Sequence, residues 1–419
     1  MNQAPTSPLS QESINSKLLL IAERLLPWLL PLLLLLSRSV ADISVLLVGL
    51  LFLFRSYQLS NWQWAKNQWF KLNILFWLYL LFINAPLSVD PVESFTYAFF
   101  YLRWPLFAAA LAYWLLDATT QRNLLIALLC VCAFIMFDTS LQYFIGHDLL
   151  GHAKASPTRL TGPYSRPVPG IMMLRVLFIG LFLSIIMPQT FNSIRRITFT
   201  ISMLCIGLLF VFITGERMAL MLFFTGSVVV LTGLLLDQKT HISKILIGLG
   251  LLLGLFTSAL ILNPEMAERS VFSIGYKLAH FFDSDYGLVF RAAYASWLQT
   301  PILGSGFHTY QTVCNQMGLL TQWGMQCSHP HNLYLQIAAE CGLIGLMLFV
   351  TMIGSIYYAA LRHHVSAKQW LITSLSLVVL SVCFWPLIGG ISILNNGVAA
   401  LVWLGVGWVL STNKTQYSA

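Results

Sequence analysis

Residues 245–262 read ILIGLGLLLGLFTSALIL, an apolar run without a single charged side chain. A membrane-spanning helix needs about 20 predominantly apolar residues, because the hydrocarbon core is about 30 Å thick and a helix rises about 1.5 Å per residue. This stretch therefore predicts a transmembrane helix. Comparable stretches lie on both sides of it, so the same argument extends outward in both directions.

The composition of the whole chain agrees with a membrane protein. Of its 419 residues, 58% are hydrophobic and only 9% are charged, and the mean hydropathy is +0.76. Soluble domains carry about 25% charged residues, so soluble enzymes, disulfide scaffolds and disordered proteins are excluded. The formal net charge is +8, but the bases stand singly beside apolar stretches. We therefore expect no nucleic-acid partner.

The apolar segments predict an all-α fold, a polytopic membrane protein with about 12 transmembrane helices. The predicted segments are 18–36, 40–54, 72–84, 95–116, 124–145, 171–187, 197–213, 219–236, 245–262, 333–361, 371–388 and 397–410. Helices 1–9 would occupy residues 1–262 and helices 10–12 residues 331–419. Between them, residues 263–330 would form a folded periplasmic loop domain. The first segment lacks a small-residue cleavage site, so we expect no removable signal peptide.

The positions of the bases predict the orientation, because cytoplasmic loops carry an excess of Lys and Arg. With the N-terminus in the cytoplasm, twelve of the 23 bases face the cytoplasm, eight face outward and three lie within spans. Seven of the eight outer bases fall in the 146–170 loop, the 214–217 turn and the 263–330 connection. Outer loops usually avoid bases, so we expect an anionic ligand on this face.

Two cysteines, Cys314 and Cys327, fall in the outer connection, 13 positions apart. Because the periplasm is oxidising, the sequence predicts a disulfide between them. The alternative is two unpaired thiols that lie too far apart to bond.

The most specific pattern lies in residues 331–345, which read HNLYLQIAAECGLIG. Pro330 precedes it and restricts the backbone, which suits a helix start. Gly342 and Gly345 are three positions apart, so one face of the helix is bare and permits close packing. His331 would stand at the outer mouth of this helix. Its imidazole titrates near about 6.5, so it suits a general base, although it could instead only bond a neighbouring carbonyl.

This pattern resembles the O-antigen ligase family, whose signature is His, then Asn, Ser or Gln, then nine residues and Gly-x-x-Gly. The twelve-span layout and the large outer loop between spans nine and ten are similar as well. The resemblance implies transfer of an O-antigen polysaccharide from undecaprenyl diphosphate to the lipid A-core oligosaccharide, at the periplasmic face of the bacterial inner membrane, without metal or other cofactor. O-antigen polymerases and protein O-oligosaccharyltransferases share much of the motif, so they remain alternatives.

The residues around the motif have roles under this resemblance. His331 would deprotonate the acceptor hydroxyl, and Asn332 would steady the mouth of the helix. His329 would be an orienting partner, or the base in place of His331. The two histidines could also be metal ligands, but no third ligand has suitable spacing, so we expect no metal.

Arginines are the expected binders of the diphosphate, because a guanidinium binds phosphate oxygens bidentately and stabilises leaving-group charge. Arg217 stands at the predicted start of the eighth span, where the helix dipole also favours an anion, and resembles the family's Gly/Ser-x-Arg segment. Arg291 stands ahead of a glycine-rich turn, as an arginine does in the family. The structural alternative for Arg217 is a pair with Glu216.

A second arginine-bearing segment, residues 159–170, reads RLTGPYSRPVPG and resembles the family's Arg-Leu-x-Gly-Pro loop. Arg159 and Arg166 would bind substrate there, although the family often has His or Asn near the position of Arg166. The alternative is a structural loop, since Gly and Pro fix turns. Arg103 lies within the predicted fourth span. It is a functional candidate because placing a charged side chain inside the membrane is costly; the alternative is that it pairs with Asp138.

Two further patterns suggest anion or metal binding. The turn at 304–306, Gly-Ser-Gly, would let backbone amides approach a phosphate. Asp283 and Asp285 could hold a divalent ion, since carboxylates suit Mg²⁺. A turn or salt-bridge role is the alternative, and the resemblance to a metal-independent family favours it.

Together these features predict an inverting glycosyltransferase of the ligase type. Polymerases often carry two large arginine-rich outer loops, whereas only one outer loop is long here. A transporter of a lipid-linked anion would place its charges at mid-membrane, whereas the predicted charges gather at the outer rim. The sugar, the acceptor hydroxyl and the oligomeric state do not follow from the sequence.

Overall fold

The computed structural model describes residues 8–237, 241–273, 275, 279–320, 324–325, 327–387, 392 and 394–413. Over these residues the fold is all-α. The β-structure among them consists of isolated bridges, and none extends into a strand. The earlier helices are α1 (Pro8–Leu36), α2 (Arg38–Gln58), α3 (Gln68–Tyr79), α4 (Pro91–Tyr101), α5 (Arg103–Ala110), α6 (Ala118–Ile145), α7 (Pro169–Gly180), α8 (Leu183–Ile186), α9 (Ser193–Ile213) and α10 (Arg217–Asp237).

The later helices are α11 (Ile242–Leu262), α12 (Pro264–Ala267), α14 (Asp285–Gln299), α15 (Tyr310–Gln316), α16 (Leu333–Ser366), α17 (Trp370–Phe384) and α18 (Asn396–Ser411). Short π or 3-10 turns are η1 (Gln63–Lys66), η2 (Leu80–Asn84), η3 (Leu111–Leu115), η5 (Glu268–Phe272) and η6 (Phe281–Asp283).

Nine helical stretches within the described residues are long and apolar enough to cross a membrane, so the chain is a multi-pass membrane protein. The three other predicted segments also contain helices, but these are shorter. Segment 72–84 holds α3 and η2, and segments 371–388 and 397–410 hold α17 and α18, of 15 and 16 residues. Twelve spans therefore stays a prediction, because these three fall below the usual spanning length.

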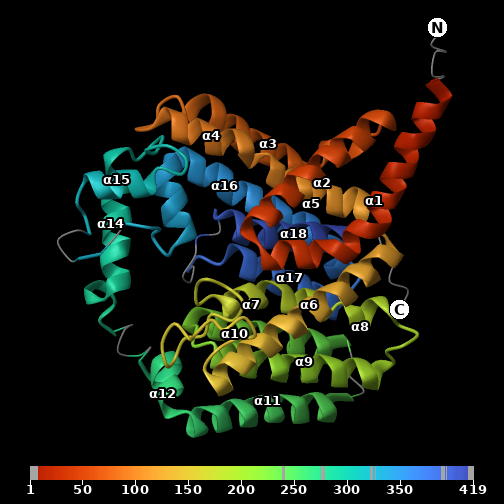
Figure 1. Cartoon of the computed structure of the whole chain (residues 1–419), viewed down its shortest axis with the longest axis vertical. Coiled ribbons are helices and arrows are strands. Elements are labelled where there is room, and N and C mark those ends of the chain that lie inside the picture. The colour runs from red at the N-terminus through yellow and green to blue at the C-terminus, as the bar shows by residue number, and fades with distance from the viewer. Residues whose placement is uncertain are drawn as a thin grey trace.

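Most helices cross the view of Figure 1 from side to side; α14 and α15 lie at its left, and α12 lies below them near the end of α11. We call this end, which carries the 263–330 connection and the 146–168 loop, the outer end of the bundle. At the lower edge, α11 lies at the periphery (Figure 1), and its Leu246, Ile247 and Leu251 side chains are exposed. Exposed apolar side chains on a membrane helix are the surface that lipid covers.

Short polar residues start several of these helices. Ser37 accepts a hydrogen bond from the Val40 amide at α2, and Asp117 forms a capping box at α6. Such caps satisfy backbone N–H groups that have no partner inside the helix. At the inner end, the Asp237 carboxylate accepts the Trp370 and Leu371 amides, which fixes the start of α17 beside the end of α10.

The outer connection has a small core of its own, in which Val289, Ala293, Tyr310 and both outer cysteines are buried. Cys314 and Cys327 form a disulfide with a Cα–Cα distance of 5.9 Å, so the predicted bond is confirmed. It closes a loop of the outer connection onto α15.

The predicted fourth segment, 95–116, is not one continuous helix. It is divided into α4, α5 and η3, and Leu102 separates the first two. Arg103 is therefore the first residue of α5 rather than a mid-helix residue. This division brings Arg103 to the outer ends of α2 and α18, where its partners lie.

Candidate active site

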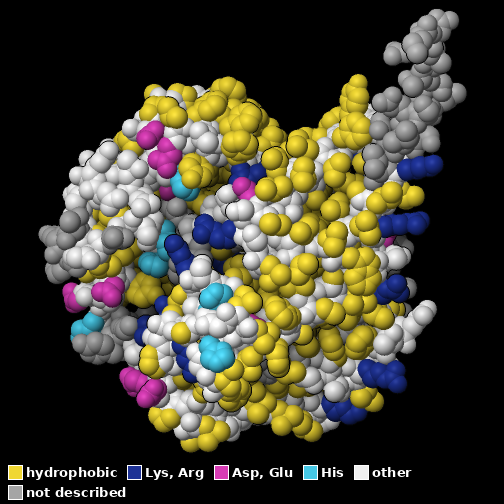
Figure 2. Space-filling view, in the orientation of Figure 1, with side chains coloured by type: hydrophobic (Ala, Val, Ile, Leu, Met, Phe, Trp, Pro, Cys, Tyr) yellow, Lys and Arg dark blue, Asp and Glu magenta, His cyan; other side chains and the backbone are white. Residues whose placement is uncertain are grey.

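A cavity of about 450 Å³ opens at the outer end, and we call it the His331 cavity. Its lining comes from the loop before α7 and the start of α7, the turn into α10, η5, the first turns of α14, Met325, and His331 ahead of α16. Figure 2 shows basic and histidine side chains gathered in a hollow of this face, beside a broad hydrophobic surface. The lining residues are Arg159, Ile171, Gly215, Glu216, Arg217, Met218, Ala219, Arg269, Asp285, Tyr286, Val289, Met325 and His331.

His331 sits directly before the helix that the sequence predicted. Asn332 is the N-cap of α16, and its side chain accepts a hydrogen bond from the Leu335 amide, as expected of a residue that steadies the helix mouth. His331 itself has a φ of 53°, in the left-handed region. That conformation costs a non-glycine residue about 1–3 kcal/mol. The fold therefore imposes a strained backbone on the residue that faces the cavity.

Two aromatic rings surround the His331 imidazole. The Tyr286 ring meets it edge-on with 5.2 Å between centroids, and the His329 ring is tilted against it at 4.2 Å. Tyr286 lines the cavity, whereas His329 does not. His329 is thus a direct neighbour of the predicted base without itself lining the cavity.

Arg217 begins α10, as predicted, and is joined to Arg269 of η5. The Arg217 Nε donates to the Arg269 carbonyl, and the Arg269 Nε donates to the Gly215 carbonyl at 3.2 Å. Gly215 has a φ of 71°, and a Cβ there would overlap the Thr158 carbonyl oxygen. Only glycine fits this turn, which brings the segment before α10 against the 158 backbone.

Arg159 is held by a loop that is anchored on α6. The Gln142 side-chain oxygen accepts hydrogen bonds from the Thr161 and Gly162 amides at 2.9 and 3.0 Å. Arg159 itself donates through Nη2 to the Pro167 carbonyl at 3.0 Å, across the same loop. The Gly and Pro residues of this segment therefore do fix a turn, and the turn delivers a guanidinium to the cavity wall.

The electrostatics of the cavity favour an anion. Among the described residues, Arg159, Arg217 and Arg269 form no ion pair with any carboxylate. Burial, and after it the positive charges of Arg159 and Arg217, lower the pKa of Arg269. A cation that feels two like charges is stabilised when an anion enters between them.

The acid nearest to these arginines serves the backbone instead. Glu216 is buried, and its two carboxylate oxygens accept the Gly170 and Ile171 amides at 2.6 and 3.2 Å, at the start of α7. Burial raises the pKa of Glu216 to about 7, although these amides and Arg159 act in the opposite direction. The predicted alternative, an Arg217–Glu216 pair, is absent among the described ion pairs.

The comparison with protein families bears on this cavity. Residues 201–350 match the O-antigen ligase family. The matched segment runs from α9 into α16 and includes Arg217, Arg269 and His331, whereas Arg159 lies before it. Members of this family are lipid-linked glycan transferases. No curated protein matches the chain.

Four residues predicted for the site lie outside this lining, among them His329, whose contact with His331 is described above. Within the matched segment, Arg291 is exposed on α14 and donates to the Phe282 carbonyl at 2.7 Å. Arg166 is exposed on a different cavity, described below, and Asn332 acts as a helix cap. Arg269 and Tyr286 were missed. The only sequence signal for Arg269 was its place among the outer bases.

The glycine turn at 304–306 does not present its amides to a ligand, so that prediction was wrong. The Ser305 and Gly306 amides donate to the Ala339 and Glu340 carbonyls, and the Gly304 amide donates to the Thr300 carbonyl. Gly342 has a φ of 67° and interrupts α16 at this point. The Ser305 and Gly306 amides are therefore bonded to the helix backbone just before the break in α16.

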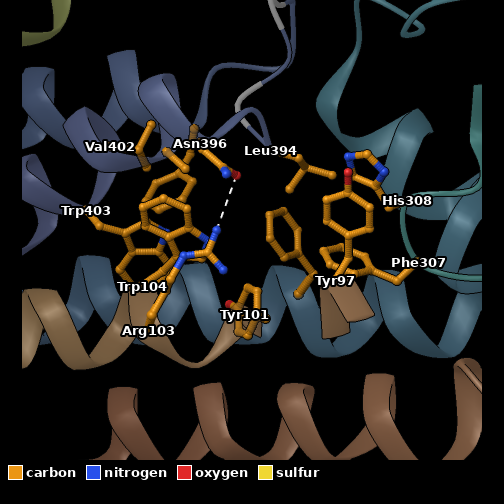
Figure 3. Close-up of a pocket in the computed structure, with 13 residues that line it drawn as sticks. Tyr97, Tyr101, Arg103, Trp104, Phe307, His308, Leu394, Asn396, Val402 and Trp403 are labelled. Carbon is orange, nitrogen blue, oxygen red and sulfur yellow. Dashed lines mark hydrogen bonds between the residues drawn. The ribbon is translucent and has the colours of Figure 1, made fainter. Parts of the chain in front are cut away.

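Arg103 pairs with Asp42 rather than with Asp138, so that alternative was also wrong. Its Nε lies 2.8 Å from an Asp42 oxygen, and Figure 3 shows its Nη2 pointing at Asn396, 3.2 Å away. Nearby, the Tyr97 ring stacks on His308 at 3.5 Å between centroids (Figure 3). The cavity between these groups holds only about 40 Å³, room for a few water molecules.

Asp283 and Asp285 do not converge on one point that an ion could occupy with a third ligand. Ser284 between them caps α14 and accepts the Gly287 amide, and only Asp285 lines the His331 cavity. Within the described residues, no three His, Cys, Asp or Glu side chains form a metal-binding group. Asp283 lies in the turn η6 and Asp285 in the first turn of α14, so metal binding by this pair stays an untested alternative.

Proposed function

We propose that this chain is an O-antigen ligase, a metal-independent inverting glycosyltransferase of the bacterial inner membrane with its site at the periplasmic face. The donor would be an undecaprenyl-diphosphate-linked glycan and the acceptor lipid A-core. The observation that supports this best is the meeting of one imidazole with three arginines in a single cavity at the outer end of a membrane bundle, where none of the three pairs with a carboxylate of the described residues.

In the proposed reaction, the acceptor hydroxyl oxygen attacks the anomeric carbon of the donor. His331 takes the hydroxyl proton, and the bond between the anomeric carbon and the phosphate oxygen breaks with its electrons going to that oxygen. Arg217, Arg269 and Arg159 hold the released diphosphate and disperse its charge. A positioned general base contributes about 10²–10⁴-fold in rate. Attack opposite to the leaving group inverts the anomeric centre.

Arg269 enters this proposal in place of Arg291. Both are outer bases of the same connection, but only Arg269 lines the His331 cavity. Arg291 donates through its guanidinium to the Phe282 carbonyl in η6, just before its own helix. We therefore assign Arg291 to the outer surface of α14 and His329 to the orientation of His331.

The decisive experiment is transfer by the purified protein in the presence of EDTA. Three acceptors are offered separately with one lipid-linked donor: lipid A-core, a second lipid-linked repeat and a pilin-like peptide. We expect transfer to lipid A-core that survives the chelator. Transfer to the lipid-linked repeat alone would instead identify a polymerase, and transfer to the peptide alone would identify a protein oligosaccharyltransferase. Donor translocation without transfer would identify a transporter.

A further inference from the structure

A second cavity lies at the outer end, apart from His331. It measures about 340 Å³ and is formed where α1 ends, where α2 and α18 begin, and where the chain approaches α7. We call it the Arg38 cavity. Its lining residues are Leu34, Leu35, Leu36, Ser37, Arg38, Ser39, Pro163, Tyr164, Ser165, Arg166, Val168, Met172, Asn395, Gly397 and Val398.

The charges of the Arg38 cavity are of one sign. Arg38 and Arg166 are the only charged residues in the lining, and within the described residues neither makes an ion pair or a side-chain hydrogen bond. Arg38 lies across the start of α18, because a Cβ on Gly397 would come within 2.9 Å of its Cγ. Two guanidinium groups without counter-charges are a strong attraction for a phosphate.

Backbone dipoles add to the same field. The cavity lies at the N-terminal ends of α2 and α18, helices of 21 and 16 residues. An N-terminus carries roughly half a positive charge and favours an anion by about 0.3–1 kcal/mol. The hydroxyl groups of Ser37 and Ser39 stand at the same rim. These contributions come from independent elements and all favour a negative ligand.

Part of the lining of the Arg38 cavity is apolar. Leu34, Leu35, Val168 and Met172 are buried with 1–6% of their surface exposed, and Leu36 beside them is 43% exposed. A free inorganic ion would gain nothing from such a wall. A lipid would place its phosphate between the arginines and its first methylene groups against the leucines.

We propose that the Arg38 cavity binds the phosphate headgroup of an amphiphilic lipid at the outer surface of the membrane. The loop 159–170 carries Arg159 to the His331 cavity and Arg166 to this one, so the two anion sites lie on one short segment. If the proposed transfer function holds, on which this last step rests, the donor diphosphate occupies the His331 cavity. The Arg38 cavity then holds a phosphate of the acceptor lipid.

The first test measures lipid binding alone. Purified full-length protein in neutral detergent is titrated with phosphatidic acid, phosphatidylcholine or inorganic phosphate. The variants are Arg38→Gln/Arg166→Gln and a control with equal charge loss at the inner end, Arg122→Gln/Arg195→Gln. We expect phosphatidic acid to bind wild type and the control equally, and the cavity variant at least about tenfold more weakly, the effect of one lost charge-assisted hydrogen bond.

Two results would overturn the lipid site: equal binding of phosphatidic acid by the cavity variant, or inorganic phosphate binding as tightly as the lipid. An Arg38→Lys/Arg166→Lys variant guards against a folding defect, because it keeps both charges. It should retain more binding than the glutamine variant, and its elution as a monodisperse species checks the fold.

The second test separates this inference from the proposed function. In the transfer assay, the Arg38→Gln/Arg166→Gln variant should raise the acceptor KM about tenfold and leave the donor KM unchanged. A raised donor KM would contradict the assignment to the acceptor. If the wild-type protein transfers nothing to any acceptor, the proposed function fails while the binding result still stands.

Discussion

Arg103 and the arginines of the His331 cavity occupy the same end of the molecule but differ in what neutralises them. Arg103 is paired with Asp42, bonded to Asn396 and covered by the Trp104 ring, 4.4 Å from its guanidinium carbon. Arg159, Arg217 and Arg269 have carbonyl partners but no ion pair among the described residues. The first arrangement stabilises the fold, whereas the second leaves positive charge for a ligand.

The largest expected effect concerns the imidazole beside these arginines. His331→Asn should lower the transfer rate by about 10²–10⁴-fold, since the variant has no base. Asparagine tolerates the left-handed backbone at this position, so the unfolding midpoint should stay close to that of wild type. Transfer assays and thermal unfolding in detergent measure the two quantities. A matched His329→Asn variant should lose much less activity, and a transfer rate unchanged in His331→Asn would refute the role of the imidazole.

A pair of glutamine variants tests most directly whether the two kinds of arginine have different roles. Arg103→Gln should lower the free energy of unfolding by about 1.5–3 kcal/mol, the contribution of a hydrogen bond to a charged group, and should leave the donor KM unchanged. Arg269→Gln should weaken donor binding at least about tenfold without lowering stability, because it relieves repulsion among like charges. Chemical unfolding and donor titration measure these effects. The same pattern in both variants would contradict the distinction.

Gly215 tests whether the arginine cavity depends on one tight turn. Gly215→Ala adds a Cβ at a positive φ and against the Thr158 carbonyl, so we expect a loss of about 1–3 kcal/mol in stability. Gly250→Ala is the matched control, because nothing lies within 4 Å of a Cβ there. Equal unfolding midpoints for the two variants would show that the turn is not constrained.

The smallest effect is the pH dependence that Glu216 contributes. Its pKa is raised to about 7 in the folded chain, against about 4.3 in an unfolded one. Between these values the folded state binds more protons, so stability is fully present below about pH 4.3 and is lost as the pH rises through about 7. Thermal midpoints of wild type should therefore fall over this window, and those of Glu216→Gln should fall less. Parallel curves would rule out this contribution.

The sequence predicted what depends on local pattern. Arg217 at a helix start, Asn332 as a cap and the cysteine pair all follow from neighbours in the chain or from the compartment. The missed features depend on contacts between distant residues. Arg103 meets an acid 61 positions away, and Arg269 reaches the cavity only because η5 returns to the turn before α10.

The same limit explains the error at the glycine turn. A Gly-Ser-Gly sequence exposes amides equally well to a phosphate or to carbonyls, and nothing nearby in sequence decides between them. The deciding partners are the backbone carbonyls beside the interruption of α16 at Gly342, more than 30 positions further along the chain. The number of spans stays a prediction for a related reason, since composition marks where a helix is apolar but not where packing ends it.

The break at Gly342 also determines what His331 is attached to. Residues 301–306 bond the backbone of α16 on both sides of it. Before the break, the Ala339 and Glu340 carbonyls accept the amides of the glycine turn, and after it the Leu343 and Ile344 amides donate to the Pro301 and Ile302 carbonyls. Residues 333–341 are thereby hydrogen-bonded to the outer connection. They also continue along the chain into the remainder of the helix, which is embedded in lipid. The nine residues between Asn332 and Gly342 in the motif thus form a short helical segment. His331 precedes its first residue, and the break at Gly342 follows its last.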